Sequence, residues 1–413
     1  MKVLYICADW GIPIRSFKGA SVHVREFVNT LDRVGHEVAL LFAEAGQGNP
    51  YPNASLIELA PDRTPEARAR QAARLGIELQ ADDRVTCREL DKLAYDAAFA
   101  TRALSRLQDV GFRPDVVYER FSLFHQAGAA IADAFGVPYV LEVNAPLIEE
   151  QERHRALRLK TVAHAAQTKC FRRASHVVTV SQALKRYIEA EGIPCHRVSC
   201  LPNGVDTQRF NPTTDPGPVR TRYHLGDRPV IGFVGSLKPW HGMDALFDAM
   251  KLLSARSGDQ RLLIVGDGPG FRYAMQRAED DALRGRIVLA GKVPHDEVPA
   301  HLAAMDLTVA PYVAEEGFYF SPLKVLESLA AGRPVVAPRL GQLNELIEHG
   351  VNGLLYDPGD LNAFAQNVHV LLSDPEQRSV MGKNARRHAV TSLSWENVVG
   401  QAIGIISETL QAA

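Results

Sequence analysis

The sequence has few cysteines, no long apolar run and almost no net charge, and each shortage excludes a class of protein. Its 413 residues include only five cysteines, an odd number without C-x-x-C spacing, so neither a disulfide framework nor a zinc site is predicted. No stretch approaches about 18 uninterrupted apolar residues, and the first apolar run (3–8) lacks the basic start of a signal peptide. We therefore expect a cytoplasmic protein that is neither secreted nor membrane-spanning.

Acidic and basic residues nearly balance, 48 against 46, which leaves a formal charge of −2. No global positive field therefore favours nucleic acid or an anionic membrane as a partner. Hydrophobic residues make up 46% and charged residues 23%, the balance of a folded protein with real cores. The length predicts two substantial domains.

Apolar runs of strand length alternate with helical patterns in two series, separated by a Pro-, Asn- and Gly-rich linker (201–219). The first series is 3–8, 37–43, 115–119, 138–143 and 176–181, and the second is 229–235, 261–266, 286–291, 306–311, 334–338 and 353–356. This pattern predicts an α/β chain of two Rossmann-like, doubly wound domains, 1–205 and 206–391, facing each other across a ligand cleft. The tail 392–413 is apolar at helical spacing.

Gly19 and Ala20 open a helical pattern after the first strand. Free amides there suit a phosphate or a sugar hydroxyl, although a simple turn glycine has the same appearance. His23 faces either the cleft or, as we expect for a lone histidine, the surface. The first strand is not followed by G-x-G-x-x-G, which weakens the case for a dinucleotide oxidoreductase.

Three glycine-bearing loops, 235–242, 266–270 and 291–299, follow strands of the second series. Small residues let a ligand approach the backbone, and Lys238 or His241 would neutralise part of a diphosphate's charge. An ordinary turn is the alternative for 266–270. The candidate ligand contacts in these first two loops are Gly235, Ser236, Gly266, Asp267 and Gly268.

The segment 311–338 predicts a strand, a loop and a helix with an anion site at its start. Ser321 is predicted as the N-cap and Pro322 as the first helical residue, so the amides of Leu323 and Lys324 would point outward. Lys324 and Glu327 share one face, which places a cation by a phosphate and a carboxylate by sugar or ribose hydroxyls. The alternative is an exposed Lys–Glu helix pair.

With these residues in place, the chain resembles glycosyltransferase family 4 over nearly its whole length. The resemblance is carried, as an ordered set, by the segments KGASVHVREF, YERFSL (118–123), LEVNAPLIEE (141–150), VVTVSQALK, LPNGVD (201–206), GSLKPWHG, FYFSPLKVLESLAAGRPVVAP and VNGLLYDPGD (351–360). It implies a GT-B fold, a UDP- or GDP-sugar donor, no metal or other cofactor, and retention of anomeric configuration. It also implies that the tail 392–413 packs back on the N-terminal domain.

The resemblance assigns roles residue by residue. It places Glu327 on the donor ribose, the Leu323 and Lys324 amides on the diphosphate, Val293 by the base and Gly19 by the donor phosphate. Tyr319 and Phe320 join the donor site. Four positions depart from the family. Tyr319 stands where the first glutamate of E-x7-E is usual, and Glu315 or Glu316 would have to take over its role. Ser236 and His241 stand where an arginine and a lysine are usual, and Asn144 stands where many relatives have a histidine.

We therefore expect a hexose-type transfer by front-face substitution, because no nucleophilic carboxylate is evident. Glu327, Lys324, Lys238, His241 and Asn144 are the catalytic candidates. The alternatives are a GT-B nucleotide-sugar epimerase and a non-catalytic sugar-nucleotide-binding protein. Sugar, lipid-linked and small-metabolite acceptors all stay open. The segment 149–175 is predicted to be long and helical, and basic after an acidic start. We expect it to be solvated; the alternatives are that it lines the acceptor side or makes weak contact with the inner face of the membrane.

Overall fold

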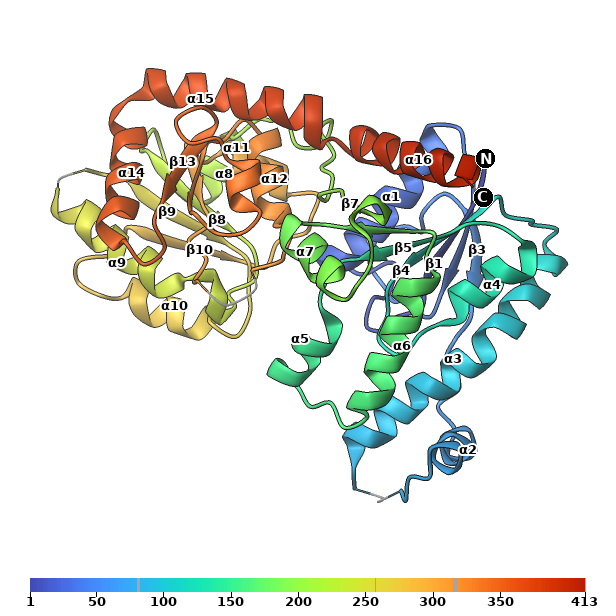
Figure 1. The fold of residues 1–413 in the computed structure, drawn as a ribbon. Helices are drawn as coiled ribbons and strands as arrows, with labels where there is room; N and C mark the ends of the chain where they lie inside the picture. The colour runs from blue at the N-terminus through green and yellow to red at the C-terminus, as the bar shows by residue number, and fades with distance from the viewer. Residues whose placement is uncertain (80–81, 257, 315–317, 413) are drawn as a thin grey trace. The chain divides into compact units, whose positions relative to one another are not determined.

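The computed structural model describes residues 1–79, 82–256, 258–314 and 318–412, and the chain forms two compact units. The first unit holds Met1–Pro202 together with the segment from Val398 onward, and the second holds Asn203–Asn397. Each unit is a parallel sheet covered by helices (Figure 1). The predicted pair of Rossmann-like α/β units is therefore confirmed.

The first unit is built on a seven-stranded sheet of order β3-β2-β1-β4-β5-β6-β7, with every neighbouring pair parallel. The strand order reverses between β1 and β4, which makes that point the topological switch. The strands are β1 (Lys2–Cys7), β2 (Glu37–Phe42), β3 (Ser55–Glu58), β4 (Val116–Arg120), β5 (Tyr139–Val143), β6 (His176–Thr179) and β7 (Val198–Cys200). The helices are α1 (Gly19–Arg33), α2 (Pro65–Leu75), α3 (Arg84–Asp109), α4 (Ala127–Phe135), α5 (Leu147–His154), α6 (Lys160–Arg173) and α7 (Gln182–Ala190).

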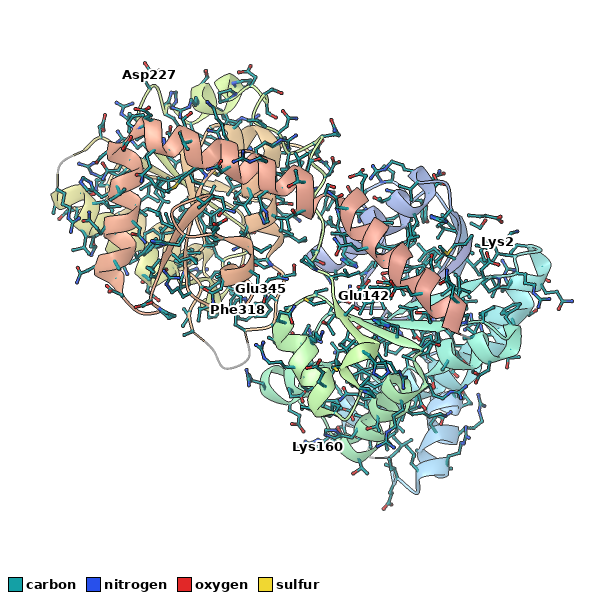
Figure 2. The ribbon with its side chains drawn as sticks, turned by 45° about the horizontal axis from the view of Figure 1, so that its top comes forward. Lys2, Glu142, Lys160, Asp227, Phe318 and Glu345 are labelled. Atoms are coloured by element: carbon teal, nitrogen blue, oxygen red, sulfur yellow. The ribbon has the colours of Figure 1, made fainter. Side chains whose placement is uncertain are left out.

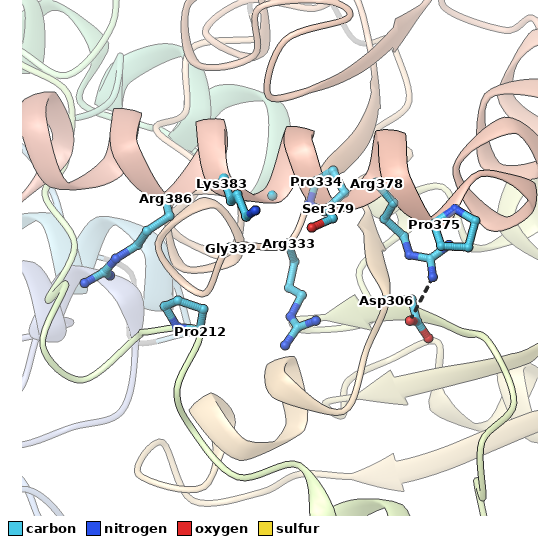
Figure 3. A pocket seen from close by; sticks show the side chains of 11 residues that line it. Pro212, Asp306, Gly332, Arg333, Pro334, Pro375, Arg378, Ser379, Lys383 and Arg386 are labelled. Atoms are coloured by element: carbon cyan, nitrogen blue, oxygen red, sulfur yellow. Dashed lines mark ion pairs between the residues drawn. The ribbon is translucent and has the colours of Figure 1, made fainter.

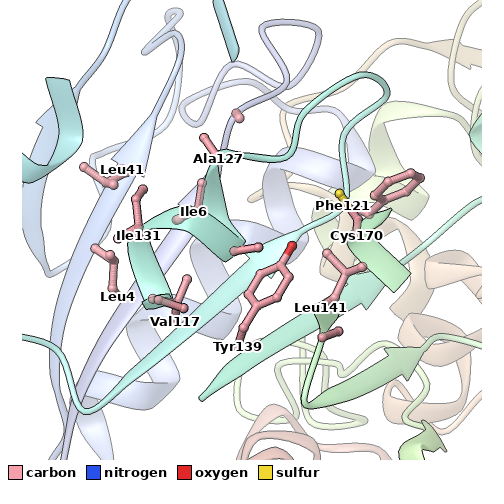
Figure 4. Close-up of a cluster of buried hydrophobic side chains, with 14 of the residues drawn as sticks. Leu4, Ile6, Leu41, Val117, Phe121, Ala127, Ile131, Tyr139, Leu141 and Cys170 are labelled. Carbon is pink, nitrogen blue, oxygen red and sulfur yellow. The ribbon is translucent and has the colours of Figure 1, made fainter. Parts of the chain in front are cut away.

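The core of this sheet is made by strands that are buried on both faces. Leu4 and Ile6 of β1 lie near Val117 of β4 and Ile131 of α4, and Leu141 of β5 belongs to the same core one strand further along the sheet (Figure 4). All five side chains are fully buried. Continuous apolar runs are typical of such doubly covered parallel strands, which is why the sequence pattern could predict them.

The second unit is built on a six-stranded sheet of order β10-β9-β8-β11-β12-β13, again with parallel pairs throughout. Its switch point lies between β8 and β11. The strands are β8 (Val230–Val234), β9 (Arg261–Val265), β10 (Ile287–Gly291), β11 (Leu307–Val309), β12 (Val335–Pro338) and β13 (Gly353–Tyr356). The helices are α8 (Gly217–Arg222), α9 (Met243–Ala255), α10 (Phe271–Ala278), α11 (Val298–Ala303), α12 (Leu323–Ala330), α13 (Leu343–Leu346), α14 (Leu361–Ser373) and α15 (Pro375–His388).

The prediction that segment 149–175 forms one long helix is wrong. It forms the end of α5 and then α6, with a break between His154 and Lys160. The buried carboxylate of Glu89 accepts the backbone N–H groups of Arg158 and Leu159, at 2.7 Å for Leu159. The helix can therefore break here without leaving the Arg158 and Leu159 amides unpaired, because the Glu89 side chain accepts their hydrogen bonds.

The last helix, α16 (Trp395–Ala412), begins among residues of the second unit, and from Val398 onward its residues belong to the first. Val399 and Ile406 are fully buried, and Ala402 is nearly so. The apolar spacing of the tail is therefore used for packing, as in other helices that cover a core with one face.

Candidate functional site

The loops that follow β8, β9, β10 and β11 leave the second sheet at its carboxyl edge, on either side of its switch point. Two of these loops are interlocked by backbone hydrogen bonds, because Leu237 N donates to Asp267 O and Gly270 N donates to Leu237 O. Gly266 has φ of 140°, and a Cβ there would lie only 2.0 Å from the Gly235 carbonyl oxygen. Close approach of two loops thus explains the glycine at 266 without a ligand.

Helix α12 begins one residue later than predicted. Pro322 is the N-cap and not the first helical residue, and Ser321 does not cap the helix. The Ser321 hydroxyl instead accepts a hydrogen bond from Asn203 N at 3.0 Å, which the cap prediction did not consider. The backbone N–H groups of Leu323 and Lys324 have no hydrogen-bond partner within the described part of the chain. The positive end of α12 is therefore open to an anion.

Lys324 extends from this open helix start over the aromatic rings of Phe233, in β8, and Tyr312, which follows β11. Its Nζ lies 4.3 Å from the Phe233 ring centroid and 5.0 Å from that of Tyr312, and it has no hydrogen bond to any described residue. A Cβ on Gly235 would lie 2.8 Å from Nζ, so the glycine makes room for the lysine. Burial lowers the pKa of Lys324 to about 7, and the Glu327 charge opposes this shift. An unpartnered buried ammonium favours an incoming anion.

Glu327 lies on the next turn of α12, and its Oε1 is 3.1 Å from Nε2 of His295 in the loop after β10. The Glu327 side chain is 13% exposed, and no ion pair with Lys324 occurs among the described residues. The alternative of an exposed Lys–Glu pair is therefore wrong. The sequence interpretation missed His295, although it lies in a quoted strand-end loop and is a polar side chain at the ligand edge of the sheet.

His241 and Lys238 follow β8, where the resemblance places the diphosphate. His241 is buried, and its Nδ1 contacts the Ser236 carbonyl oxygen. Burial and the charge of Lys324 lower the pKa of His241 to about 3, so at neutral pH it supplies no positive charge, contrary to the expectation. Lys238 Nζ lies 5.3 Å from the Trp240 ring centroid. Lys324 and Lys238 are therefore the charged groups of this loop region that remain from the predicted set.

Aromatic side chains gather in the segment after β11. Tyr312, Phe318 and Phe320 contact one another at centroid distances of 5.0 to 6.4 Å, and the Tyr319 ring lies 4.7 Å from that of Phe320. Figure 2 labels Phe318, which is buried in this group. Val293, in the loop after β10, is half-buried against the same core. The suggested substitutes Glu315 and Glu316 lie outside the described residues.

In the first unit, α1 begins at Gly19, as predicted, and the amides of Gly19 and Ala20 have no partner in the described ranges. His23 is buried and its Nε2 lies 2.8 Å from Oε1 of Glu142, so the expectation of a surface histidine is wrong. The apolar spacing of the helix hid this contact, because the partner belongs to β5, more than a hundred residues later.

Glu142 is the centre of a buried polar network (Figure 2). It accepts hydrogen bonds from Tyr118 at 2.9 Å, Arg120 at 3.1 Å and Asn144 Nδ2 at 2.7 Å. Burial by itself would raise the pKa of Glu142, but His23, Arg120 and Asn144 together lower it to about 2. Asn144 therefore serves this network through its amide nitrogen, while its Oδ1 is buried without a partner among the described residues.

A cavity of the second unit, about 490 Å³ in volume, lies away from these loops (Figure 3). Asp306 and Pro334, which line it, precede β11 and β12 and so lie at the amino ends of the strands. Arg386 donates to the carbonyls of Thr207, Phe210 and Ala330, and Arg378 pairs with Asp306 at 3.5 Å. These arginines bind loops and helix ends together, which is a structural role.

Comparisons with known proteins agree with this geometry. Residues 17–209 match the model of "Glycosyltransferase Family 4" and residues 228–374 that of "Glycosyl transferases group 1". The chain is 35% identical over 239 residues to the GDP-mannose-dependent alpha-(1-6)-phosphatidylinositol monomannoside mannosyltransferase of Mycolicibacterium smegmatis, a match that covers 57% of this chain and 62% of that relative. The chain thus spans less than two thirds of the relative's length.

Solved structures show the same fold. Sucrose-phosphate synthase from Thermosynechococcus elongatus superposes with a TM-score of 0.73 at 18% identity, and HepE from Anabaena in complex with UDP with 0.70 at 22% identity. Both comparisons cover 100% of each chain. Among the described residues, no helix combines the length and apolarity needed to cross a bilayer.

Proposed function

This chain belongs to the family 4 glycosyltransferases, and from that membership we propose that it transfers a hexose-type sugar from a UDP- or GDP-sugar to an acceptor hydroxyl, with retention of anomeric configuration and without a metal. The donor classes are suggested by the UDP bound to HepE and by the GDP-mannose named for the mannosyltransferase relative. Sugar, lipid-linked and small-metabolite acceptors are the classes to test.

One observation carries the proposal: the open amides of α12 and the unpartnered ammonium of Lys324 converge beside the switch point of the second sheet. A helix start and a buried cation together favour a diphosphate, which carries two negative charges and many acceptor oxygens. Gly235, without a side chain, allows the lysine to reach this position. Lys238 in the same loop region adds charge at the periphery.

Glu327 takes the ribose in this proposal. It lies one turn beyond the helix start, so a nucleotide with its diphosphate at the Leu323 and Lys324 amides presents its sugar diol to the carboxylate. Its Oε1 is already oriented by His295 at 3.1 Å, and the remaining lone pairs of Oε1 and Oε2 are left for the two hydroxyls. Carboxylates accept hydroxyl hydrogen bonds strongly because the acceptor is charged.

The proposed step is a front-face substitution. The acceptor oxygen forms a bond to the anomeric carbon while the bond from that carbon to the diphosphate oxygen breaks, and the acceptor proton passes to the leaving diphosphate. Charge builds up on the diphosphate in the transition state, and the α12 amides and Lys324 are oriented to stabilise it there. The positive charge comes from the chain's own groups, which is why we propose metal independence.

The test is a transfer assay with UDP-glucose and GDP-mannose, each with EDTA, against a panel of sugar, lipid-linked and small-metabolite acceptors. We expect nucleoside diphosphate release only with an acceptor, an α-configured product from either donor by NMR, and at least a hundredfold lower rate for Lys324→Met. Binding of a donor without turnover on any acceptor would favour the non-catalytic protein. Conversion of the donor without an acceptor would favour the epimerase.

A further inference from the structure

A second cavity, in the first unit, has a strongly basic lining. Its volume is about 350 Å³, and Arg84, Arg88 and Lys92 of α3 line it together with Arg155, which follows α5. Leu123 and Phe124, both buried, form part of an apolar wall. We call this cavity the basic pocket. Its lining contains four cationic side chains and one carboxylate, that of Glu89.

One carboxylate offsets only part of the charge of the four cations. Glu89 accepts backbone N–H groups from Arg158 and Leu159, so both of its oxygens are already hydrogen-bonded. Within the described residues, no ion pair or side-chain hydrogen bond engages Arg84, Arg88 or Arg155, and Lys92 only lies over the Trp10 ring at 5.9 Å. The basic pocket therefore has an excess of positive charge, with Glu89 and Asp9 as the carboxylates that act on Lys92.

The placement of these cations is unfavourable for the helix that carries them. Arg84, Arg88 and Lys92 recur every four residues, which stacks three like charges on one face of α3. Arg84 is the first residue of α3, at the positive end of the helix dipole, where cations destabilise. Burial also lowers the pKa of Lys92. The side chains of Arg84, Arg88 and Arg155 are exposed, so an anion that enters the basic pocket meets cations without another side-chain partner among the described residues.

The basic pocket adjoins the ligand edge of the first sheet. Leu123 and Phe124 follow β4, and Phe124 has φ of 72°, an uncommon conformation for a bulky residue. Lys92 also lines a small neighbouring cavity with Asp9 and Trp10, which follow β1. The strand order reverses between β1 and β4, so the basic pocket lies next to the switch point of this unit.

We propose that the basic pocket binds the phosphate group of the acceptor, which is thus a hydroxyl-bearing phosphate ester, either free or as a lipid headgroup. An arginine guanidinium can donate two parallel hydrogen bonds to two oxygens of one phosphate group. A phosphate dianion also carries enough charge to interact with several cations at once, whereas a carboxylate carries a single charge. That the bound phosphate ester is a sugar acceptor rests on the proposed function. That the basic pocket binds a phosphate group does not depend on the donor.

The test measures binding of glycerol 3-phosphate and of inorganic phosphate by calorimetry, with vesicles of phosphatidylglycerol or phosphatidylcholine as the lipid arms. The variant Arg84→Gln/Arg88→Gln should bind phosphate at least tenfold more weakly. Its thermal midpoint should stay the same or rise, because like-charge repulsion is removed. The control is Arg106→Gln, an exposed arginine near the other end of α3, which should bind like wild type.

Phosphate binding without vesicle binding supports a free phosphate ester, and binding to phosphatidylglycerol that the double variant loses supports a lipid headgroup. The proposal is overturned if the double variant binds both phosphate and phosphatidylglycerol vesicles as well as wild type does. It is also overturned if Arg106→Gln loses as much affinity as the double variant. UDP and GDP binding is measured on the same variants and should be unchanged. A protein that binds phosphate here but never transfers sugar would refute the proposed function and leave this site standing.

Discussion

The Glu327 carboxylate lies 3.1 Å from Nε2 of His295, a residue 32 positions earlier in the chain. The contact joins the second turn of α12 to the loop after β10, an edge strand of the sheet. It holds one carboxylate oxygen in place before any ligand arrives. A preoriented acceptor loses less rotamer freedom when it binds, which favours affinity.

We expect Glu327→Ala to weaken nucleoside diphosphate binding about ten- to a hundredfold, since charge-assisted hydrogen bonds to two ribose hydroxyls contribute roughly 1.5–3 kcal/mol. Calorimetric titration of UDP and GDP measures this. His295→Ala, which removes the partner and keeps the carboxylate, should lose much less. A 2′,3′-dideoxy nucleotide should bind wild type poorly and the variant only slightly worse. Equal affinity of both proteins for the normal nucleotide contradicts the ribose assignment.

Donor binding should weaken above neutral pH. The free-state pKa of Lys324 is about 7, and a bound diphosphate raises it, so the contribution of the charged lysine is fully present below pH 7 and is lost as pH rises toward the bound-state value. Affinity for UDP-glucose or GDP-mannose should fall by up to about tenfold per pH unit over that range. Their diphosphates are diesters and keep a constant charge.

The matched variants are Lys324→Met and Lys238→Met. The first should bind weakly at every pH, without the slope, whereas the second should weaken binding and keep the slope. Calorimetry in buffers of different ionisation enthalpy should show proton uptake near pH 8 for wild type and Lys238→Met. A wild-type affinity that does not change from pH 6.5 to 9 would refute the role of Lys324.

Glu142→Gln should destabilise the first unit by about 3–5 kcal/mol at pH 7, because the buried Arg120 guanidinium would lose its counter-charge. The pKa of Glu142 is depressed from 4.5 to about 2, so its stabilisation is present above pH 4.5 and is lost as pH falls toward 2. The difference in free energy of unfolding between wild type and Glu142→Gln should therefore become smaller by roughly 3 kcal/mol in acid. Urea unfolding at pH 7 and at low pH measures it.

The control for that series is Glu37→Gln, whose carboxylate is exposed and pairs with Lys2 at 3.0 Å. Surface pairs contribute at most about 1 kcal/mol, so this variant should follow wild type at both pH values. A constant difference between wild type and Glu142→Gln across the pH range would show that Glu142 does not titrate as inferred.

The C-terminal helix should stabilise the first unit through its buried face. Ile406 is fully buried, so Ile406→Ala should lower the free energy of unfolding by about 2–5 kcal/mol. Leu410 is 38% exposed, so Leu410→Ala should lower it by about 0.5 kcal/mol or less. Deletion of residues 393–413 should lower the thermal midpoint further. Calorimetric scans of the three proteins decide the matter, and a truncated chain with the full wild-type midpoint would contradict the prediction.

The main strands were predictable because they are buried on both faces and read as continuous apolar runs. β3 and β7 were not predicted, since β3 buries only Ile57 of its four residues and β7 is three residues long. Short edge strands with one inward side chain leave no period in the sequence. A continuous apolar run therefore identifies strands that are covered by helices on both faces, and it misses short strands at the edges of the sheet.

The site was predictable at its glycines and at the helix that carries Lys324 and Glu327, because both follow strand ends. Its electrostatics were not. His241 is neutral and Lys324 is buried because of Phe233, Tyr312 and Gly235, which meet only in the folded unit. Ser321 likewise was assigned to the helix cap, whereas its hydroxyl is bound by Asn203, which is 118 residues away.

The division of the chain has a consequence for its biosynthesis. The first unit includes the residues from Val398 onward, so it is incomplete until the ribosome has made the whole of the second unit, Asn203–Asn397. Nascent chains fold from the N-terminus as they emerge, and an unfinished unit exposes apolar surface meanwhile. The second unit, whose residues are contiguous, is free to fold before the first one closes. Completion of the first unit, which begins the chain, therefore comes after synthesis of the second.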